Sequence, residues 1–396
     1  MNLFKNRILK PISVILLSLI LIFVGLLGIY DYIIPDTVSY FEGDGLPVFM
    51  YAEASAKNCD SGENAEYRLL GVVPIKTVKL TSYKDIKLVP GGMPFGVKFF
   101  TDGMIVADFC DVSTEQGKVN PAKNAGLKIN DLITHIDGHP TAGTEDLSDA
   151  IDASGGKEIT LTYTRGGVTH NVKLTPVKCT ADGKYKTGIM IKDSGAGIGT
   201  VSFIEPESGL FGGLGHGICD VESGELIPMK RGAIVDVTIS GVEKGISGTP
   251  GEIKGFFNRQ KLGSMIKNSD CGVFGVFTEP LQNPLSEPLP IGLKSDIKEG
   301  DATIYCTLDD GEMKEYSIKI SNVDKNAAHG KCFNVKVTDP ELIEKTGGII
   351  QGMSGSPIIQ NGKLVGAVTH VLVNDPTRGY GIFIENMLNQ INDMAS

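Results

Sequence analysis

Ser354 is the residue that could most directly act on a peptide bond. It lies in the segment GMSGSP, Gly352 to Pro357. A serine nucleophile needs an exposed hydroxyl, a nearby base and backbone N–H groups for the developing oxyanion, and flanking glycines leave room for such a turn. The residues that follow, PIIQNGKLVGAVTHV, predict a strand, an Asn361-Gly362 turn and a second strand. The alternative is a glycine-rich hairpin end whose serine has no catalytic role.

A serine at neutral pH needs a base, and histidine is the usual one. The chain has six histidines: His135, His139, His170, His216, His329 and His370. His216 lies in GLFGGLGHGICD, where glycines on both sides suit close approach to a second element. We therefore favour His216 as the base and keep His329, in the loop segment KNAAHGKCF, as a second candidate. A turn or capping role is the structural alternative.

A carboxylate would orient the imidazole of the base. The candidates are Asp220, Asp236, Asp270, Asp309 and Asp339. Their spacing alone does not choose between them, and most such residues lie in turns or on surfaces.

The elements that must position these residues are expected to be mainly strands. Fifty glycines among 396 residues favour many tight turns, because glycine adopts positive φ without strain. The net charge of −10 and the lack of a basic cluster argue against nucleic-acid binding. Seven scattered cysteines form no C-x-x-C pair, so we expect no zinc site and no cofactor, and we expect most of the thiols to be buried and free.

The N-terminal segment has the composition of a membrane anchor. Lys5, Arg7 and Lys10 precede nineteen uncharged residues, 12–30. At about 1.5 Å per residue these span about 28 Å, close to the thickness of the bilayer core. The basic flank predicts a cytoplasmic N-terminus and an extracytoplasmic bulk. A cleaved signal peptide is the alternative, but no small-residue cleavage site follows closely. We assign 1–30 to this tip and anchor.

A short β-rich spacer is expected over 31–88, followed by a domain over 89–178 that resembles a PDZ domain. Three segments carry this resemblance: GGMPFGV, AGLKINDLITHIDG and the helical EDLSDAI. The resemblance implies that Pro94, Phe95, Gly96 and Val97 line a peptide-binding site, where a free strand edge and backbone N–H groups capture a peptide. The alternative is a domain that only packs against its neighbour.

Residues 179–396 show short strands with many turn signals, which is typical of a sandwich or barrel. The GMSGSP block with its hairpin and the trailing strand GYGIF resembles the nucleophile region of chymotrypsin-like serine peptidases. That resemblance implies a double β-barrel.

A closer resemblance covers about residues 88–390. The segments GIGTVSFIEPESGLFGGLGHGICD and GMSGSPIIQNGKLVGAVTHVLVNDPTRGYGIFIENML are similar to the SpoIVB family of sporulation peptidases, which also place a PDZ domain before the peptidase. The resemblance implies His216 as base, Ser354 as nucleophile and Asp339, in VKVTDPELIEKTGG, as the acid. The N–H groups of Ser354 and Gly352 would bind the oxyanion.

The family resemblance also implies a biological role. Such peptidases are anchored in the forespore membrane and act in the space between the forespore and mother-cell membranes. They cleave a membrane-bound inhibitor of an intramembrane metalloprotease that activates a late mother-cell sigma factor. They also cleave themselves near the N-terminus, and YAEASAKN, Tyr51 to Asn58, is a candidate site.

Two other functions are compatible with the sequence. One is a PDZ-based scaffold with an inactive peptidase domain, and the other is an envelope protease of broad specificity. A metalloenzyme is a weaker third alternative, because no His/Asp/Glu cluster has ligand spacing.

Overall fold

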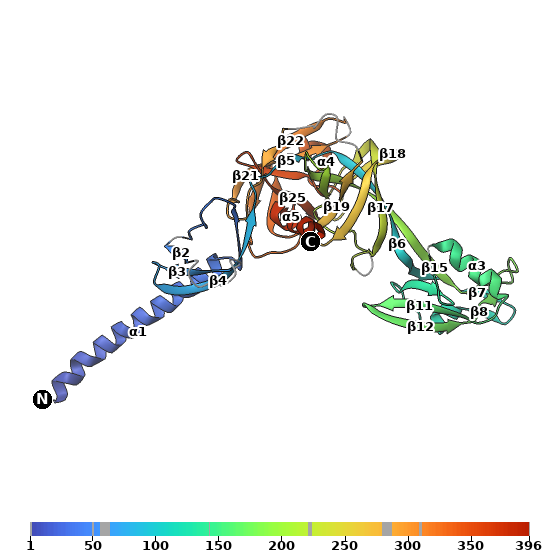
Figure 1. The fold of residues 1–396 in the computed structure, drawn as a ribbon, viewed down its shortest axis with the longest axis horizontal. Helices are drawn as coiled ribbons and strands as arrows, with labels where there is room; N and C mark the ends of the chain where they lie inside the picture. Colours follow the sequence, from blue (N-terminus) through green and yellow to red (C-terminus); the bar gives the residue numbers. More distant parts are fainter. Residues whose placement is uncertain are drawn as a thin grey trace.

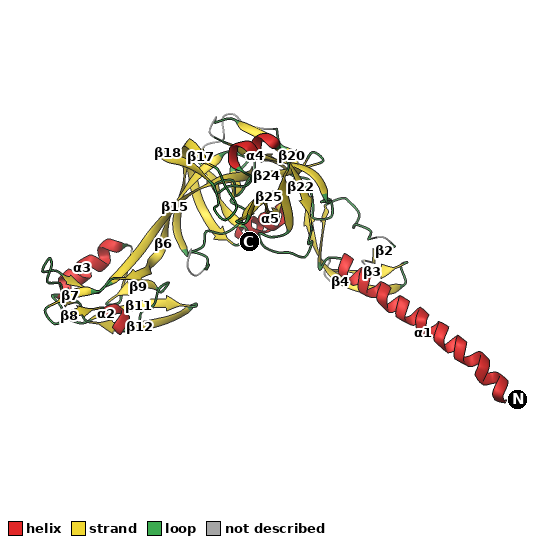
Figure 2. Ribbon diagram, turned by 180° about the vertical axis from the view of Figure 1, so that it is seen from behind, coloured by secondary structure: helices red, strands yellow, loops and turns green. Residues whose placement is uncertain are grey.

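The computed structural model describes residues 2–49, 51–55, 64–141, 143–220, 224–278, 287–308 and 311–395. Figure 1 shows an elongated molecule with a long N-terminal helix at one end, two β-barrels in the middle and a PDZ-like domain at the other end. Seen from behind, in Figure 2, strands dominate every part except the N-terminal helix. The mainly β architecture agrees with the high glycine content.

The N-terminal helix α1 (Asn2–Ile33) leads into a small sheet. Its residues Val14–Ile33 are long and apolar enough to cross a membrane. The sheet has strand order β1-β4-β3-β2 and consists of β1 (Thr37–Phe41), β2 (Ala52–Ser55), β3 (Asn64–Leu69) and β4 (Val73–Tyr83). Tyr30 and Ile34 at the end of α1 are buried in the core of this sheet. The candidate cleavage segment begins at β2, while its residues 56–58 lie outside the described residues.

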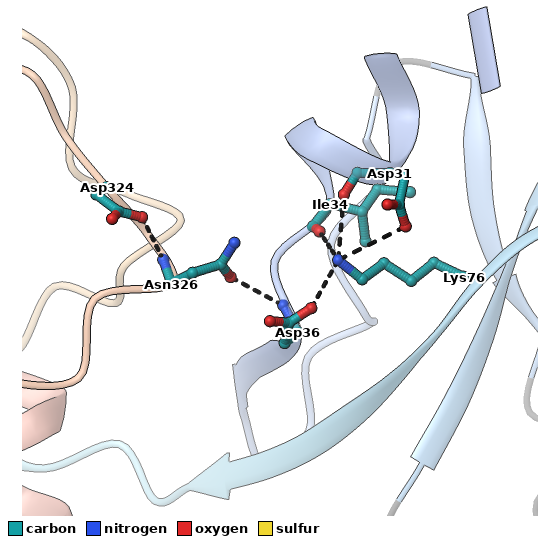
Figure 3. Close-up of polar contacts among 6 residues, drawn as sticks. All are labelled: Asp31, Ile34, Asp36, Lys76, Asp324 and Asn326. Atoms are coloured by element: carbon teal, nitrogen blue, oxygen red, sulfur yellow. Dashed lines mark hydrogen bonds and ion pairs between the residues drawn. The ribbon is translucent and has the colours of Figure 1, made fainter. Parts of the chain in front are cut away.

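Lys76 of β4 caps the C-terminal end of α1 (Figure 3). Its Nζ donates to the carbonyls of Ile34 at 2.9 Å and Asp31 at 3.1 Å, and it pairs with the Asp36 carboxylate at 2.7 Å. A cation at this position complements the negative end of the helix dipole. Next to it, the Asp36 N–H donates to Asn326 Oδ1 of the second barrel at 3.0 Å. The segment after the apolar helix is therefore hydrogen-bonded to the second barrel.

The second barrel is closed and comes from one stretch of sequence. Its strand order is β21-β22-β23-β26-β25-β24. The strands are β21 (Gly300–Thr307), β22 (Met313–Ser321), β23 (Phe333–Val337), β24 (Pro357–Gln360), β25 (Lys363–Leu372) and β26 (Asp375–Phe383). Helix α4 (Pro340–Thr346) precedes β24, and α5 (Ile384–Ala395) follows β26. Buried Phe333 and Phe383, with ring centroids 5.3 Å apart, lie in its core.

The first barrel has six strands in the order β6-β17-β18-β19-β16-β15, and it closes because β15 also pairs with β6. The strands are β6 (Pro94–Phe109), β15 (Ile189–Ile204), β16 (Leu210–Gly213), β17 (Met229–Glu243), β18 (Glu252–Ser269) and β19 (Gly272–Phe277). Short β5 (Lys87–Pro90) and β20 (Leu289–Pro290) extend the sheet beyond β15. Phe95, Val97 and Phe211 fill its core.

The PDZ-like domain is inserted between the first two strands of this barrel. The end of β6 and the start of β15 continue into the domain, where Phe109 pairs with Ile189. Its other elements are β7 (Val112–Thr114), β8 (Gly117–Val119), α2 (Pro121–Asn124), β9 (Leu132–Ile136), β10 (His139–Pro140), α3 (Thr144–Ser154), β11 (Ile159–Arg165), β12 (Val168–Leu174), β13 (Val177–Lys178) and β14 (Tyr185–Lys186). Leu147 and Ile151 of α3 pack on its sheet.

This insertion corrects two expectations. The boundaries 89–178 and 179–396 do not separate the domains, because β6 begins in the first barrel and β15 begins in the PDZ-like domain. Pro94, Phe95, Gly96 and Val97 belong to the barrel, where β6 pairs with β15 on one side and β17 on the other. Their strand has no free edge there, and Phe95 and Val97 are buried, so these residues do not form a PDZ-type groove in which a peptide pairs with a strand edge.

Candidate active site

Ser354 lies on a tight turn between α4 and β24 in the second barrel. Gly352 (φ +97°) and Gly355 (φ +99°) adopt the left-handed backbone that glycine allows, while Met353 between them is fully buried and anchors the turn. Ser354 itself is half-buried, and its hydroxyl donates to the Thr369 carbonyl on β25 at 2.7 Å. The hydroxyl must therefore rotate before it can give its proton to a base.

Two backbone N–H groups of this turn are available to a ligand. Met353 N–H donates to Ile350 O at 3.1 Å, and Gly355 N–H donates to Val368 O at 2.7 Å. Within the described part of the chain, the amides of Gly352 and Ser354 donate no such bond. An oxyanion hole requires a pair of preorganised donors of this kind beside the nucleophile.

His216 follows β16 in the first barrel. The turn before it is strained, since Leu214 has φ +65° although it is not a glycine. The ring Nδ1 lies 2.9 Å from the Gly217 carbonyl, which assigns the proton to Nδ1 and leaves Nε2 as an acceptor. Burial lowers the pKa of His216 below its usual 6.5, so the imidazole is held in the neutral form that a general base needs.

Two consecutive residues of β25 contact Ser354 and His216, one each. Thr369 accepts the Ser354 hydroxyl, and the ring of His370 lies 4.6 Å, centroid to centroid, from the ring of His216. Burial, the neighbouring His216 and Lys331 together lower the pKa of His370 to about 4. The second candidate base, His329, is exposed on the loop before β23.

Asp339, the predicted acid, lies at the start of helix α4. It is the N-cap of α4: its Oδ1 accepts from the N–H groups of Glu341 and Leu342 at 3.0 and 3.2 Å, and its Oδ2 accepts from Ser317 N–H at 3.3 Å. The partner of the His216 Nδ1 is instead the Gly217 carbonyl. Asp339 therefore serves as a helix cap in this structure, and its role as the catalytic acid stays a prediction.

Three of the other candidate acids lie in or beside the first barrel. Asp236 accepts from the Asn258 amide on β18, which places it on the barrel wall. Asp270 lies in the β18–β19 turn, next to Ser269, whose carbonyl approaches Gly217. Asp220 lines the cavity beside His216 described next. Asp309 lies outside the described residues.

A largely apolar cavity of about 530 Å³ lies beside His216 in the first barrel. Its wall includes Val97, Phe99, Ile198 and Leu214. Because His216 also lines it, an apolar side chain of a bound peptide could enter the cavity while the peptide contacts the imidazole.

A second groove, of about 400 Å³, lies in the PDZ-like domain between α3 and the start of β15. Leu147 and Ile151 of α3 line one side, and Ile189 and Ile191 of β15 line the other. A strand next to a helix is the arrangement that peptide addition to a sheet edge requires. The signal in the sequence that could have located this groove is the short segment KTGIMI, where Gly188 (φ +78°) precedes the strand.

The chain resembles proteins of known sequence over short segments. It is 41% identical over 73 residues to a putative zinc metalloprotease of Lactococcus lactis and 44% identical over 59 residues to one of Neisseria meningitidis. These segments cover 18% and 15% of this chain and only 17% and 13% of those proteins. The match therefore spans less than a fifth of either relative.

Solved structures give weak matches. The active form of a protease from Mycobacterium tuberculosis is 11% identical, with 51% of this chain and 75% of that chain covered and a TM-score of 0.30. The HtrA-type protease AlgW with a decapeptide is 13% identical, with 54% of this chain and 54% of that chain covered and a TM-score of 0.31. These likenesses are too weak to assign an activity.

Family models match two parts of the chain. A PDZ domain model matches residues 114–165, which lie within the inserted domain. The model of the SpoIVB peptidase S55 family matches residues 183–388, just over half of the chain, and this range contains His216, Ser354 and nearly all of both barrels. The protein therefore belongs to the SpoIVB S55 family of serine peptidases.

Proposed function

We propose that the protein is a membrane-anchored serine endopeptidase in which Ser354 attacks the peptide carbonyl and His216 is the general base. His216 Nε2 takes the serine proton and returns it to the leaving amine. The Gly217 carbonyl, at 2.9 Å from Nδ1, holds the tautomer and accepts from the imidazolium when it forms. The amides of Gly352 and Ser354 stabilise the oxyanion. The observation that carries this proposal is the pair of unbonded amides beside Ser354 in the described part of the chain.

The test is covalent labelling of the full-length chain by a serine-reactive fluorophosphonate. We expect the wild type to label, and we expect Ser354→Ala and His216→Ala to lose labelling while they remain folded. Ser356→Ala is the matched control, because the buried Ser356 hydroxyl has no hydrogen-bond partner in the described part of the chain. A folded wild type that does not label would instead support the scaffold function.

The substrates are proposed to be proteins held near the membrane. The apolar helix α1 is proposed to be an uncleaved anchor with a cytoplasmic N-terminus; Lys76 holds its end to the small sheet, and the Asp36 N–H bonds to Asn326 of the second barrel. The groove between α3 and β15 would bind a peptide of the substrate or of a regulator, and the cavity beside His216 would take an apolar side chain next to the cleaved bond.

Family membership supports a role in sporulation. In this role the peptidase works between the forespore and mother-cell membranes, cleaves itself near its N-terminus and cleaves an inhibitor of an intramembrane protease. The test compares wild-type and Ser354→Ala chains in a spore-forming host. Ser354→Ala should keep the uncleaved size and fail to activate a late mother-cell sigma-factor reporter. Rapid degradation of unfolded casein by the wild type would favour an envelope quality-control protease instead.

A further inference from the structure

Thr200 connects the two halves of the active site through all of its polar groups. It lies near the end of β15 in the first barrel and is 2% exposed. Its N–H donates to the Ser354 carbonyl at 2.9 Å, and its hydroxyl donates to the Gly352 carbonyl at 2.7 Å. Its own carbonyl accepts from Leu214 N–H at 3.2 Å, two residues before His216.

These bonds act on the peptide groups that flank the nucleophile. The Gly352–Met353 peptide group is held through its carbonyl by the Thr200 hydroxyl and through its N–H by Ile350. The Ser354–Gly355 peptide group is held through its carbonyl by Thr200 N–H and through its N–H by Val368. Rotation of either group would move the intervening amide of Ser354 away from the oxyanion.

The turn that carries Ser354 packs so closely on Thr200 that no side-chain atom fits between them. A Cβ built on Gly355 would lie 1.9 Å from the Thr200 carbonyl oxygen and 2.6 Å from Leu214 N. The backbone of the nucleophile turn therefore packs directly on the strand that also holds the segment of the base. Such tight packing favours one relative position of the two barrels over a range of positions.

We propose that Thr200 is a positioning residue for catalysis, whose hydroxyl sets the orientation of the oxyanion-binding turn relative to His216. The inference rests on the proposed function, since it requires Ser354 to be the nucleophile. Thr200 contacts neither substrate nor the reacting atoms, so its effect must pass through the Gly352 and Ser354 carbonyls.

The neighbouring Ser202 provides a matched control on the same strand. Its hydroxyl is fully buried, as is that of Thr200, but it has no hydrogen-bond partner in the described part of the chain. Loss of the Ser202 hydroxyl removes a buried polar group without altering the turn, whereas loss of the Thr200 hydroxyl frees the Gly352 carbonyl.

The experiment measures fluorophosphonate labelling of the full-length chain in detergent, with the limiting rate of labelling separated from the half-saturating concentration. For Thr200→Val we expect the limiting rate to fall about 10- to 100-fold, up to the effect of losing one oxyanion donor, with little change in the half-saturating concentration. Thr200→Ser should restore the rate to within about threefold of the wild type, and Ser202→Ala should label normally. Thermal unfolding of each variant confirms that it is folded, and Thr200→Ala replaces Thr200→Val if the latter does not fold.

Two results would overturn the proposal. If Thr200→Val labels as fast as the wild type, or if Thr200→Ser is as slow as Thr200→Val, the hydroxyl does not position the turn. If the wild type itself does not label although it is folded, the proposed function fails and the inference fails with it. Labelling of the wild type therefore shows whether the proposed function is wrong or only the proposed role of Thr200.

Discussion

The two barrels of this peptidase differ in how the chain passes through them. The second barrel, which carries Ser354, is built from the continuous stretch 300–383. The first barrel, which carries His216 and Thr200, opens between β6 and β15 to admit the PDZ domain. Ser354, the proposed nucleophile, therefore lies in a barrel built from one continuous stretch. His216, the proposed base, lies in a barrel that shares β6 and β15 with the PDZ domain.

This difference indicates where the activity can be controlled. β15 begins beside α3, where Ile189 and Ile191 line the PDZ groove, and it reaches Thr200 within the same strand. Among the described strands, those of the second barrel are not shared with the PDZ domain. Changes in the first barrel, or where it contacts the Ser354 turn, should accordingly affect the alignment of the site, while changes elsewhere in the second barrel should affect stability.

The largest effect should follow from removal of the base in the first barrel. We expect His216→Ala to lower the rate of self-cleavage or of peptide hydrolysis by about 10⁴-fold or more, because the serine then has no proton acceptor. His370→Ala, which removes the neighbouring ring from the second barrel, should retain activity within about tenfold. Rates of the purified full-length chains test this pair, and equal losses would mean that the assignment of the base is incomplete.

A smaller decrease in the labelling rate should follow from a substitution that pushes the two barrels apart. A methyl group on Gly355 would collide with the Thr200 carbonyl, so Gly355→Ala should slow labelling by about 100-fold, comparable to the loss of an oxyanion donor. Gly362→Ala is the control: it has a similar positive φ of +75° in the β24–β25 turn, but no atom lies within 4 Å of the position that its methyl group would take. It should lower stability by about 1 kcal/mol and leave labelling unchanged. Similar labelling by both variants would contradict the tight contact between the barrels.

Substitutions of Asp339 test whether its carboxylate acts as a helix cap or as a catalytic acid. Asparagine is also a good N-cap, so Asp339→Asn should change stability and activity little, whereas Asp339→Ala should cost about 1 kcal/mol of stability. An orienting acid behaves in the opposite way, since conversion to Asn then lowers the rate by about 10⁴-fold without unfolding the chain. Denaturant unfolding and labelling of the two variants decide between these roles.

The pH profile should give the smallest of these effects. Because burial lowers the pKa of His216, the neutral base persists below pH 6.5, and the labelling rate should fall only as the pH drops further. His370→Asn should move this midpoint upward, by less than about one pH unit, because it admits water to the imidazole. The charge of His370 cannot be the cause, since its pKa of about 4 keeps it neutral in this range. A wild-type midpoint at or above 6.5 would contradict the burial of the base.

Much of the organisation could be predicted from local sequence. The apolar run of 12–30 predicted a helix, and α1 covers it. The segments around Ser354 and His216 contain the glycines that such turns need, and Gly215, Gly352 and Gly355 have positive φ. These features depend on neighbours within a few residues, which is why periodicity and turn chemistry were sufficient.

Three features required the tertiary structure. The apolar alternation of Phe95 and Val97 indicates a strand, but only the pairing of β6 with β15 and β17 assigns that strand to a barrel. Asp339 before a proline is compatible with an N-cap as well as with an acid, and only the folded chain shows that three backbone N–H groups donate to its carboxylate. Thr200 is one polar residue in the apolar run IGTVSFI, and its contacts with Gly352 and Ser354 are 152 and 154 positions away in the chain. Local sequence determined which turns and strands form, whereas long-range packing decided which of them meet.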